Sequence, residues 1–230
     1  MSPICPRLLK GIVGLIEMSG YNVCIRSVEI GRRYLMIEVE IKVRIPSCEL
    51  IEAKLIQLGF KKSQTLQEVD YYYNGVDRDF RKSHEALRLR LTESLDGSAV
   101  VADRPGETSV QLTYKGPKLD NVSMSRVEHQ VNLDDFETMQ AILSSLGYKP
   151  VMPVMKLRRE YFSEEMTACV DTVDNLGDFL ELEIIANSES ERETDLEKIE
   201  RVLEQLGFSM DDTTTVSYLS LLEGVPYDRK

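Results

Sequence analysis

The stretch IEVEIKVR, residues 37–44, alternates Ile and Val with the charged residues Glu38, Glu40, Lys42 and Arg44. Because a β-strand sends successive side chains to opposite faces, this stretch is predicted to be a strand with one apolar face and one charged face. A charged face in contact with water is the ordinary explanation for a single strand of this kind. The rest of the sequence has to show whether the pattern recurs.

The composition limits the classes of partner. The chain has 230 residues, a hydrophobic fraction of 42% and a formal net charge of −11. This length and apolar content are sufficient for one large domain or two small ones with a real core. A net negative charge disfavours binding to nucleic acids or to an anionic membrane surface, both of which require positive charge. We therefore expect neither nucleic acid nor membrane as a partner, and basic residues that bind an anion must be gathered locally.

The cysteines and the amino terminus indicate a cytoplasmic protein. Four cysteines lie far apart without paired spacing, and only His84 and His129 could join them in a zinc site, so a disulfide framework or structural zinc is disfavoured. LLKGIVGLIEM (8–18) is too short for a membrane span and lacks a cleavage site. Because Met36 directly precedes the first strand, residues 1–35 are predicted to be an extension. A misassigned start codon is one explanation, and an extra helix and strand packed on the domain is the other.

Three segments end on Leu, Gly and an aromatic residue. They are CELIEAKLIQLGF (48–60), DFETMQAILSSLGY (135–148) and DLEKIERVLEQLGF (195–208). Their apolar spacing predicts amphipathic helices, and the glycine is suited to a left-handed residue at the helix end. Further strand-like stretches lie between them: QEVDYYY (67–73), ALRLRLT (86–92), SVQLTYK (109–115) and VMKLRREYF (154–162).

The pattern of the first strand recurs, with two charged residues flanking an apolar one. The pairs are Arg88 and Arg90, Arg126 and Glu128, Lys156 and Arg158, and Glu181 and Glu183. An open sheet with a wet outer face and a closed barrel with a charged lumen both satisfy this pattern. If the bases converge, an anion with many oxygens, such as a polyphosphate, would relieve their repulsion. Carboxylates beside that anion would need a divalent metal, and oxygen ligands favour Mg²⁺ or Mn²⁺.

The order of these motifs resembles the CYTH superfamily, also called triphosphate tunnel metalloenzymes, which includes class IV adenylyl cyclases, thiamine triphosphatases and inorganic triphosphatases. Glu38-x-Glu40-x-Lys42 resembles the family's opening signature. The later motifs that resemble the family are DYYYNGVDRDF followed by ALRLR (70–90), LTYKGP (112–117), SRVEHQV (125–131), KLRREYF (156–162), DTVDNLGDFLELE (171–183) and TVSYLSLL (215–222). LTYKGP and LGDFLELE are most similar to the class IV adenylyl cyclase group.

The resemblance implies an α+β fold, a closed eight-stranded antiparallel β-barrel with a charged lumen and helices packed outside. It implies a CYTH domain over residues 36–222 and a tail over 223–230. The residues implied to bind phosphate are Lys42, Arg88, Arg90, Lys115, Arg126, Lys156 and Arg158, and among them Lys42, Lys115 and Arg158 are implied to be catalytic. The residues implied to bind Mg²⁺ or Mn²⁺ are Glu38, Glu40, Asp171, Glu181 and Glu183.

Three functions are consistent with these residues, and the resemblance favours the first. The first is a class IV adenylyl cyclase that converts ATP to cyclic AMP and pyrophosphate. The second is a triphosphatase that hydrolyses the terminal phosphate of an inorganic or organic triphosphate such as thiamine triphosphate. The third is a non-catalytic sensor of nucleotide or polyphosphate. In each case the partner is a nucleoside triphosphate or another small triphosphate, and a homodimer is one assembly that the resemblance allows.

Overall fold

The computed structural model describes residues 37–96, 106–118, 126–186, 188 and 191–225. The chain divides into two units, Met1–Arg33 and Tyr34–Lys230, and only the second contains described residues. The predicted extension over residues 1–35 therefore lies outside the described residues, as do residues 226–230 of the predicted tail.

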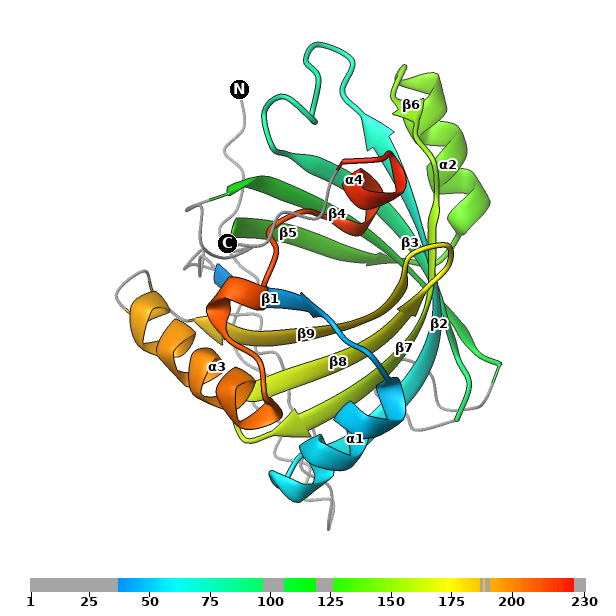
Figure 1. The fold of residues 1–230 in the computed structure, drawn as a ribbon. Helices are drawn as coiled ribbons and strands as arrows, with labels where there is room; N and C mark the ends of the chain where they lie inside the picture. The colour runs from blue at the N-terminus through cyan, green and yellow to red at the C-terminus, as the bar shows by residue number, and fades with distance from the viewer. Residues whose placement is uncertain (1–36, 97–105, 119–125, 187, 189–190, 226–230) are drawn as a thin grey trace, which may run out of the picture. The chain divides into compact units, whose positions relative to one another are not determined.

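The strands form one antiparallel sheet that closes on itself (Figure 1). Around the barrel the order is β2, β3, β4, β5, β1, β9, β8 and β7, and β2 pairs with both β7 and β3. Their bounds are β1 Ile37–Arg44, β2 Lys61–Asn74, β3 Ala86–Ser94, β4 Thr108–Lys118, β5 Arg126–Leu133, β7 Val154–Ser163, β8 Met166–Val173 and β9 Gly177–Ala186. A short strand, β6 Lys149–Pro150, adds to the outer edge of β2. The predicted eight-stranded barrel is confirmed.

The three segments that end on Leu-Gly-aromatic are helices. These helices are α1 Cys48–Gln57, α2 Phe136–Ser145 and α3 Arg192–Leu206. Side chains of Ser47 and Asp135 accept hydrogen bonds from the first turns of α1 and α2. The Gly207 residue that ends α3 has a φ of 96°, a left-handed conformation that is inexpensive only for glycine. None of the helices in the described part of the chain has the length and apolar character that crossing a bilayer requires.

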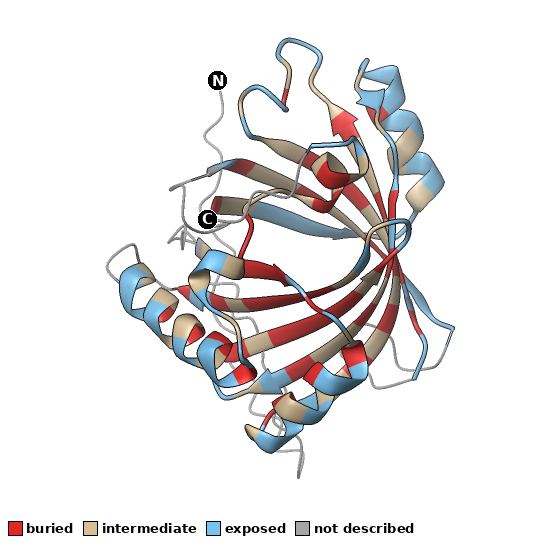
Figure 2. Cartoon of the chain, in the orientation of Figure 1, coloured by how far each residue is buried: buried red, intermediate tan, exposed pale blue. Residues whose placement is uncertain are grey.

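The apolar core lies between these helices and the outer face of the barrel. Figure 2 shows buried residues along the strands and on the inner sides of α1 and α3. Helices α1 and α3 cover β1, β8 and β9 through residues that include Ile41, Leu55, Val170, Leu182 and Leu203. Helix α2 covers β3 and β4 through Leu89, Val110 and Leu143. With their apolar sides covered, the strands turn their charged sides inward.

Helix α4, Tyr218–Leu222, occupies a different position, at one end of the barrel. Tyr218 and Leu221 pack against Val154, Val173 and Phe179 near the ends of β7, β8 and β9. The preceding segment follows the edge of β1, where the Thr214 N–H donates to the Lys42 carbonyl at 2.9 Å. This edge is accessible because, among the described residues, β1 pairs with β5 only at Ile37 and Glu38.

Candidate functional site

Strand register places the charged residues of neighbouring strands opposite one another on the lumen face. Glu40 is opposite Glu183, Lys42 is opposite Glu181, and Arg158 is opposite Asp171. Facing residues of an antiparallel pair point to the same side of the sheet. On the other strands the facing pairs are Glu68 with Lys156, Asp70 with Arg90, and Lys115 with Glu128. The charged pattern that the sequence contains therefore converges inside the barrel.

Arg158 and Lys42 share acidic partners from β8 and β9. The Arg158 guanidinium donates to both oxygens of Asp171 at 2.8 and 2.6 Å, and it also donates to Glu181. The Lys42 ammonium lies 3.2 Å from Glu181. Burial alone would raise the pKa of Glu181, but Lys42 and Arg158 outweigh it and hold the pKa well below its usual range. These ion pairs fix both bases in place.

Two acidic residues of β2 support Arg90 and Lys156 in the same way. Arg90 donates to Asp70 at 2.5 and 2.9 Å and to Glu68 at 2.7 Å, and the Lys156 ammonium lies 3.2 Å from Glu68. Burial would raise the pKa of Asp70, but the surrounding bases hold it well below its usual range. No role was predicted for Glu68 and Asp70, although they too lie two positions apart in a strand.

Arg88 differs from its neighbours because it has few protein partners. Its Nη2 donates to the Thr113 hydroxyl at 3.3 Å, and its Nε lies 3.8 Å from Asp70. That Nε is buried and forms no hydrogen bond. A buried guanidinium with unused donors is suited to binding an anion. We name Lys42, Arg88, Arg90, Lys156 and Arg158 the basic cluster.

Three carboxylates form a separate group, which we name the acidic cluster: Glu38, Glu40 and Glu183. Their oxygens lie within 4.8 Å of one another. Burial, followed by repulsion from Glu181, raises the pKa of Glu40 to about 7. Burial and the nearby Glu38 also raise the pKa of Glu183 well above its usual range. A divalent cation would remove this repulsion, and oxygen ligands without histidine or cysteine fit Mg²⁺ or Mn²⁺, so the residues fit such an ion.

Lys115 joins the acidic cluster to the barrel wall of β4 and β5. Its ammonium lies 3.5 Å from Glu38 and also pairs with Glu128. Although burial would raise the pKa of Glu38, Lys115 and other nearby groups lower it to about 2. Arg126 is buried at the end of β5, opposite Glu38 in the register.

The structure divides the five predicted metal ligands into two groups. Glu38, Glu40 and Glu183 are the predicted ligands that lie within metal-binding reach of one another in the described residues. Asp171 and Glu181 instead contact bases of the basic cluster. Their predicted role as ligands stays a prediction, and their observed contacts hold Arg158, Lys156 and Lys42 in place.

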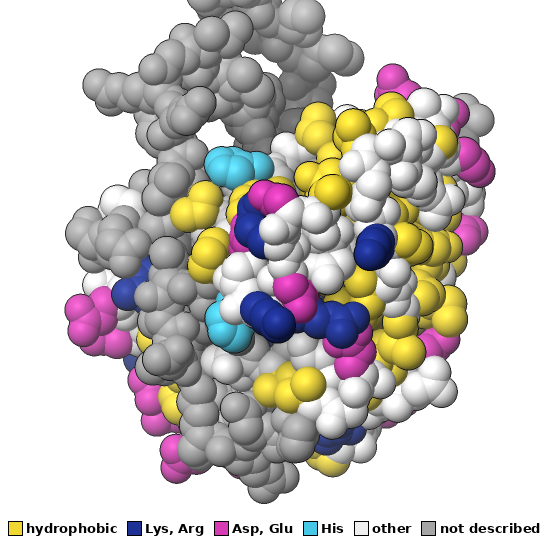
Figure 3. Space-filling model, turned by 90° about the horizontal axis from the view of Figure 1, so that it is seen from above, with side chains coloured by type: hydrophobic (Ala, Val, Ile, Leu, Met, Phe, Trp, Pro, Cys, Tyr) yellow, Lys and Arg dark blue, Asp and Glu magenta, His cyan; other side chains and the backbone are white. Residues whose placement is uncertain are grey.

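Tyr218 of α4 closes over the basic cluster from one end of the barrel. Its hydroxyl donates to Asp171 at 3.0 Å. The centre of its ring lies 4.3 Å from the Lys42 ammonium and 5.4 Å from that of Lys156. Figure 3, which views the molecule from above, shows lysine and arginine side chains beside acidic ones on the upper face of the molecule. Tyr218 belongs to the TVSYLSLL motif (215–222), but its contacts with the basic cluster were not predicted.

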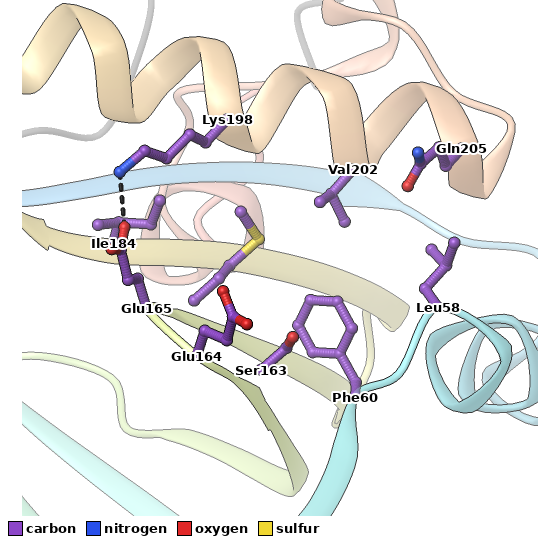
Figure 4. A pocket seen from close by; sticks show the side chains of 10 residues that line it. Leu58, Phe60, Ser163, Glu164, Glu165, Ile184, Lys198, Val202 and Gln205 are labelled. Atoms are coloured by element: carbon purple, nitrogen blue, oxygen red, sulfur yellow. Dashed lines mark hydrogen bonds and ion pairs between the residues drawn. The ribbon is translucent and has the colours of Figure 1, made fainter.

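A cavity of about 360 Å³ lies outside the barrel, between α3 and the turn that joins β7 to β8 (Figure 4). Its lining includes the apolar residues Phe60, Met166 and Val202, and its rim includes Lys198, which donates to Glu165 at 2.6 Å. It shares no residue with the basic or acidic clusters. The charged lumen is therefore the better candidate site.

The comparisons with known proteins agree with this architecture. A family model described as the CYTH domain matches residues 36–218. A Methanocaldococcus jannaschii protein with the provisional name adenylate cyclase is 41% identical over 186 residues, which cover 81% of this chain and 98% of that protein. The adenylate cyclase CyaB of Aeromonas hydrophila is 25% identical over 188 residues, which cover 81% of this chain and 88% of CyaB.

Solved structures show the same fold. A Pyrococcus horikoshii protein superposes with a TM-score of 0.72 at 34% identity, over 81% of this chain and 98% of its own. A Hippeastrum protein, provisionally called an adenylyl cyclase and reported with a dominant triphosphatase activity, superposes with a TM-score of 0.56 at 17% identity. That alignment covers 85% of this chain and all of the Hippeastrum chain, and at this identity it supports the fold alone.

Proposed function

This chain belongs to the CYTH domain family, and on that premise we propose that it is a metal-dependent enzyme that converts ATP to cyclic AMP and pyrophosphate. The observation that carries the proposal is a basic cluster and an acidic cluster in one lumen, joined by strand pairing between β1 and β9. A protein that only bound phosphate could do so with the bases alone. Carboxylates that repel one another beside those bases are explained by a cation that acts together with the substrate.

The basic cluster is proposed to bind the triphosphate. Arg88 has an unused buried donor, while Arg158 is held by Asp171 and Glu181 with its guanidinium inside the lumen. Fixed guanidinium and ammonium groups bind phosphate oxygens and stabilise the charge that develops as pyrophosphate leaves. Because the supporting carboxylates already orient these groups, they need little rearrangement during the reaction.

The acidic cluster is proposed to hold Mg²⁺ or Mn²⁺ through Glu38, Glu40 and Glu183. The bound cation would neutralise phosphate charge and lower the pKa of an attacking hydroxyl. In the proposed reaction, the ribose 3′-hydroxyl gives its proton to solvent water, and its oxygen forms a bond to the α-phosphorus. The bond from that phosphorus to the bridging oxygen breaks, and pyrophosphate takes the electron pair. Lys115, which pairs with Glu38 and Glu128, is proposed to stabilise charge on the α-phosphate.

A product analysis tests this proposal. The purified full chain is incubated with ATP and Mn²⁺, and cyclic AMP, pyrophosphate and orthophosphate are separated. We expect equal amounts of cyclic AMP and pyrophosphate. Inorganic tripolyphosphate should inhibit without being consumed, because it occupies the basic cluster but has no ribose hydroxyl. Orthophosphate release without cyclic AMP would contradict the cyclase proposal.

A triphosphatase is the second candidate, because the buried unused donor of Arg88 and the three carboxylates of the acidic cluster would serve an attack on the γ-phosphorus equally well. Water would attack the γ-phosphorus, and the same basic cluster would stabilise the charge on the leaving diphosphate. This activity predicts orthophosphate release from tripolyphosphate itself. Tight metal-dependent binding of ATP without any product would instead indicate a sensor.

A further inference from the structure

The lumen face of β4 and β5 carries neutral polar side chains where the other strands carry mainly charged ones. Thr113 is opposite Gln130, and Gln111 is opposite Asn132. On β4, these residues lie two and four positions before Lys115, which is opposite Glu128. All six side chains therefore lie on one face of the two strands. We name Gln111, Thr113, Gln130 and Asn132 the amide strip.

The side chains of the amide strip can form hydrogen bonds, and two of them are exposed to solvent. The Gln111 amide donates to the Asn132 side-chain oxygen at 3.3 Å. Gln130 and Asn132 are exposed, in contrast to the buried Arg88 and Arg158. A neutral carboxamide offers a donor and an acceptor together, and it is easier to desolvate than a charge. The strip is thus suited to an uncharged part of a ligand that has both donors and acceptors.

The amide strip adjoins the basic cluster. Thr113 accepts the hydrogen bond from Arg88, and Gln111 is opposite Arg90 in the register. Two residues along a strand span about 6.6 Å, comparable to the length of a ribose between its 5′ phosphate and its base. A triphosphate bound at Arg88 and Lys115 could therefore extend its nucleoside over Thr113 and Gln130.

From this juxtaposition we infer that the amide strip binds the adenine of ATP, with Gln130 as the main specificity-determining residue. The inference rests on the proposed triphosphate site. A carboxamide matches the 6-amino donor and N7 acceptor at one edge of adenine. Guanine presents two acceptors at the same edge, which one carboxamide cannot match in the same way. Gln130 should therefore favour adenine over guanine. Asn132 lies two residues further along β5 on the same face.

Calorimetric binding to Gln130→Leu tests the inference. The ligands are the α,β-methylene analogues of ATP and GTP, which cannot be cyclised, and inorganic tripolyphosphate, each with Mn²⁺. We expect the variant to bind the ATP analogue about tenfold more weakly and to lose the preference for adenine. Tripolyphosphate, which has no base, should bind as tightly as it does to the wild type.

Gln205→Leu is the matched control, because Gln205 is exposed on α3 outside the barrel and undergoes the same chemical change. It should leave all three affinities unchanged. If Gln130→Leu weakened the binding of tripolyphosphate as much as that of the ATP analogue, the effect would be a general structural one, and the inference would be overturned. An unchanged ratio between the affinities for the ATP analogue and the GTP analogue would also overturn the inference. If the wild type bound none of the three ligands, the proposed function itself would fail.

Discussion

At the scale of single residues, the lumen contains carboxylates with opposite roles. Asp171 accepts hydrogen bonds from Arg158 and Tyr218, so its charge is balanced by protein groups. Glu40 is buried beside Glu183 and has only Lys42, at 3.8 Å, as a salt-bridge partner among the described residues. A charge that the protein does not balance is available to a cation. The acidic residues therefore differ in function because of their neighbours.

Glu40→Gln tests the role of the acidic cluster. The amide keeps the shape of the side chain but removes a charge that would offset the metal. We expect metal-dependent turnover to fall about 100-fold, equivalent to roughly 3 kcal/mol of lost charge stabilisation. Without metal, the variant should unfold at a temperature no lower than the wild type, because repulsion with Glu183 is removed. Unchanged turnover across a Mn²⁺ titration would show that the acidic face is only solvated.

At the scale of elements, two segments close one end of the barrel. Helix α4 inserts Tyr218, and Arg81 of the loop between β2 and β3 pairs at 2.5 Å with Glu223, the residue directly after α4. The loop is itself ordered by Glu85, which accepts hydrogen bonds from Arg78, Ser83 and Tyr114. Each segment is therefore held by polar contacts that a single substitution can remove.

Tyr218→Phe removes one of these contacts. The ring stays over Lys42, but Asp171 loses the hydroxyl donor. A hydrogen bond to a charged group contributes about 1.5 to 3 kcal/mol, so the free energy of unfolding should fall by about that amount in denaturant titrations. Tyr71→Phe is the control, because Tyr71 packs on Phe136 outside the barrel at a ring separation of 4.9 Å. Equal losses in the two variants would contradict the importance of the bond to Asp171.

Glu85 gives the loop a defined pH dependence. Hydrogen bonds from Arg78, Ser83 and Tyr114 lower the pKa of Glu85 from 4.5 to about 2. Between these pH values the folded protein binds fewer protons than the unfolded chain, so this contribution to stability is present above pH 4.5 and is lost as the pH falls to about 2. Thermal unfolding of Glu85→Gln should show a shallower loss of stability over that range. Parallel curves for variant and wild type would rule out this linkage.

At the scale of the whole molecule, the sequence supports the barrel better than it supports the details of the site. Alternating charge predicts the strands and the charged face, but periodicity alone is equally consistent with an open sheet. The prediction that the sheet closes into a barrel came from the resemblance to a known family. The pairing of β2 with both β3 and β7 confirms it. Contacts such as Tyr218 with Asp171 depend on where α4 packs, and no local pattern encodes that. The division of the acidic residues follows in the same way from register: Asp171 faces Arg158, whereas Glu183 faces Glu40.

The central claim is that the lumen binds a triphosphate together with a divalent metal. Crystals of the full chain, soaked with Mn²⁺ and α,β-methylene ATP, would test it through an anomalous difference map recorded for manganese. We predict a manganese peak within coordination distance of Glu38, Glu40 and Glu183, with phosphate density against Arg88 and Arg158. Manganese bound outside the barrel, or phosphate density remote from these arginines, would contradict the account.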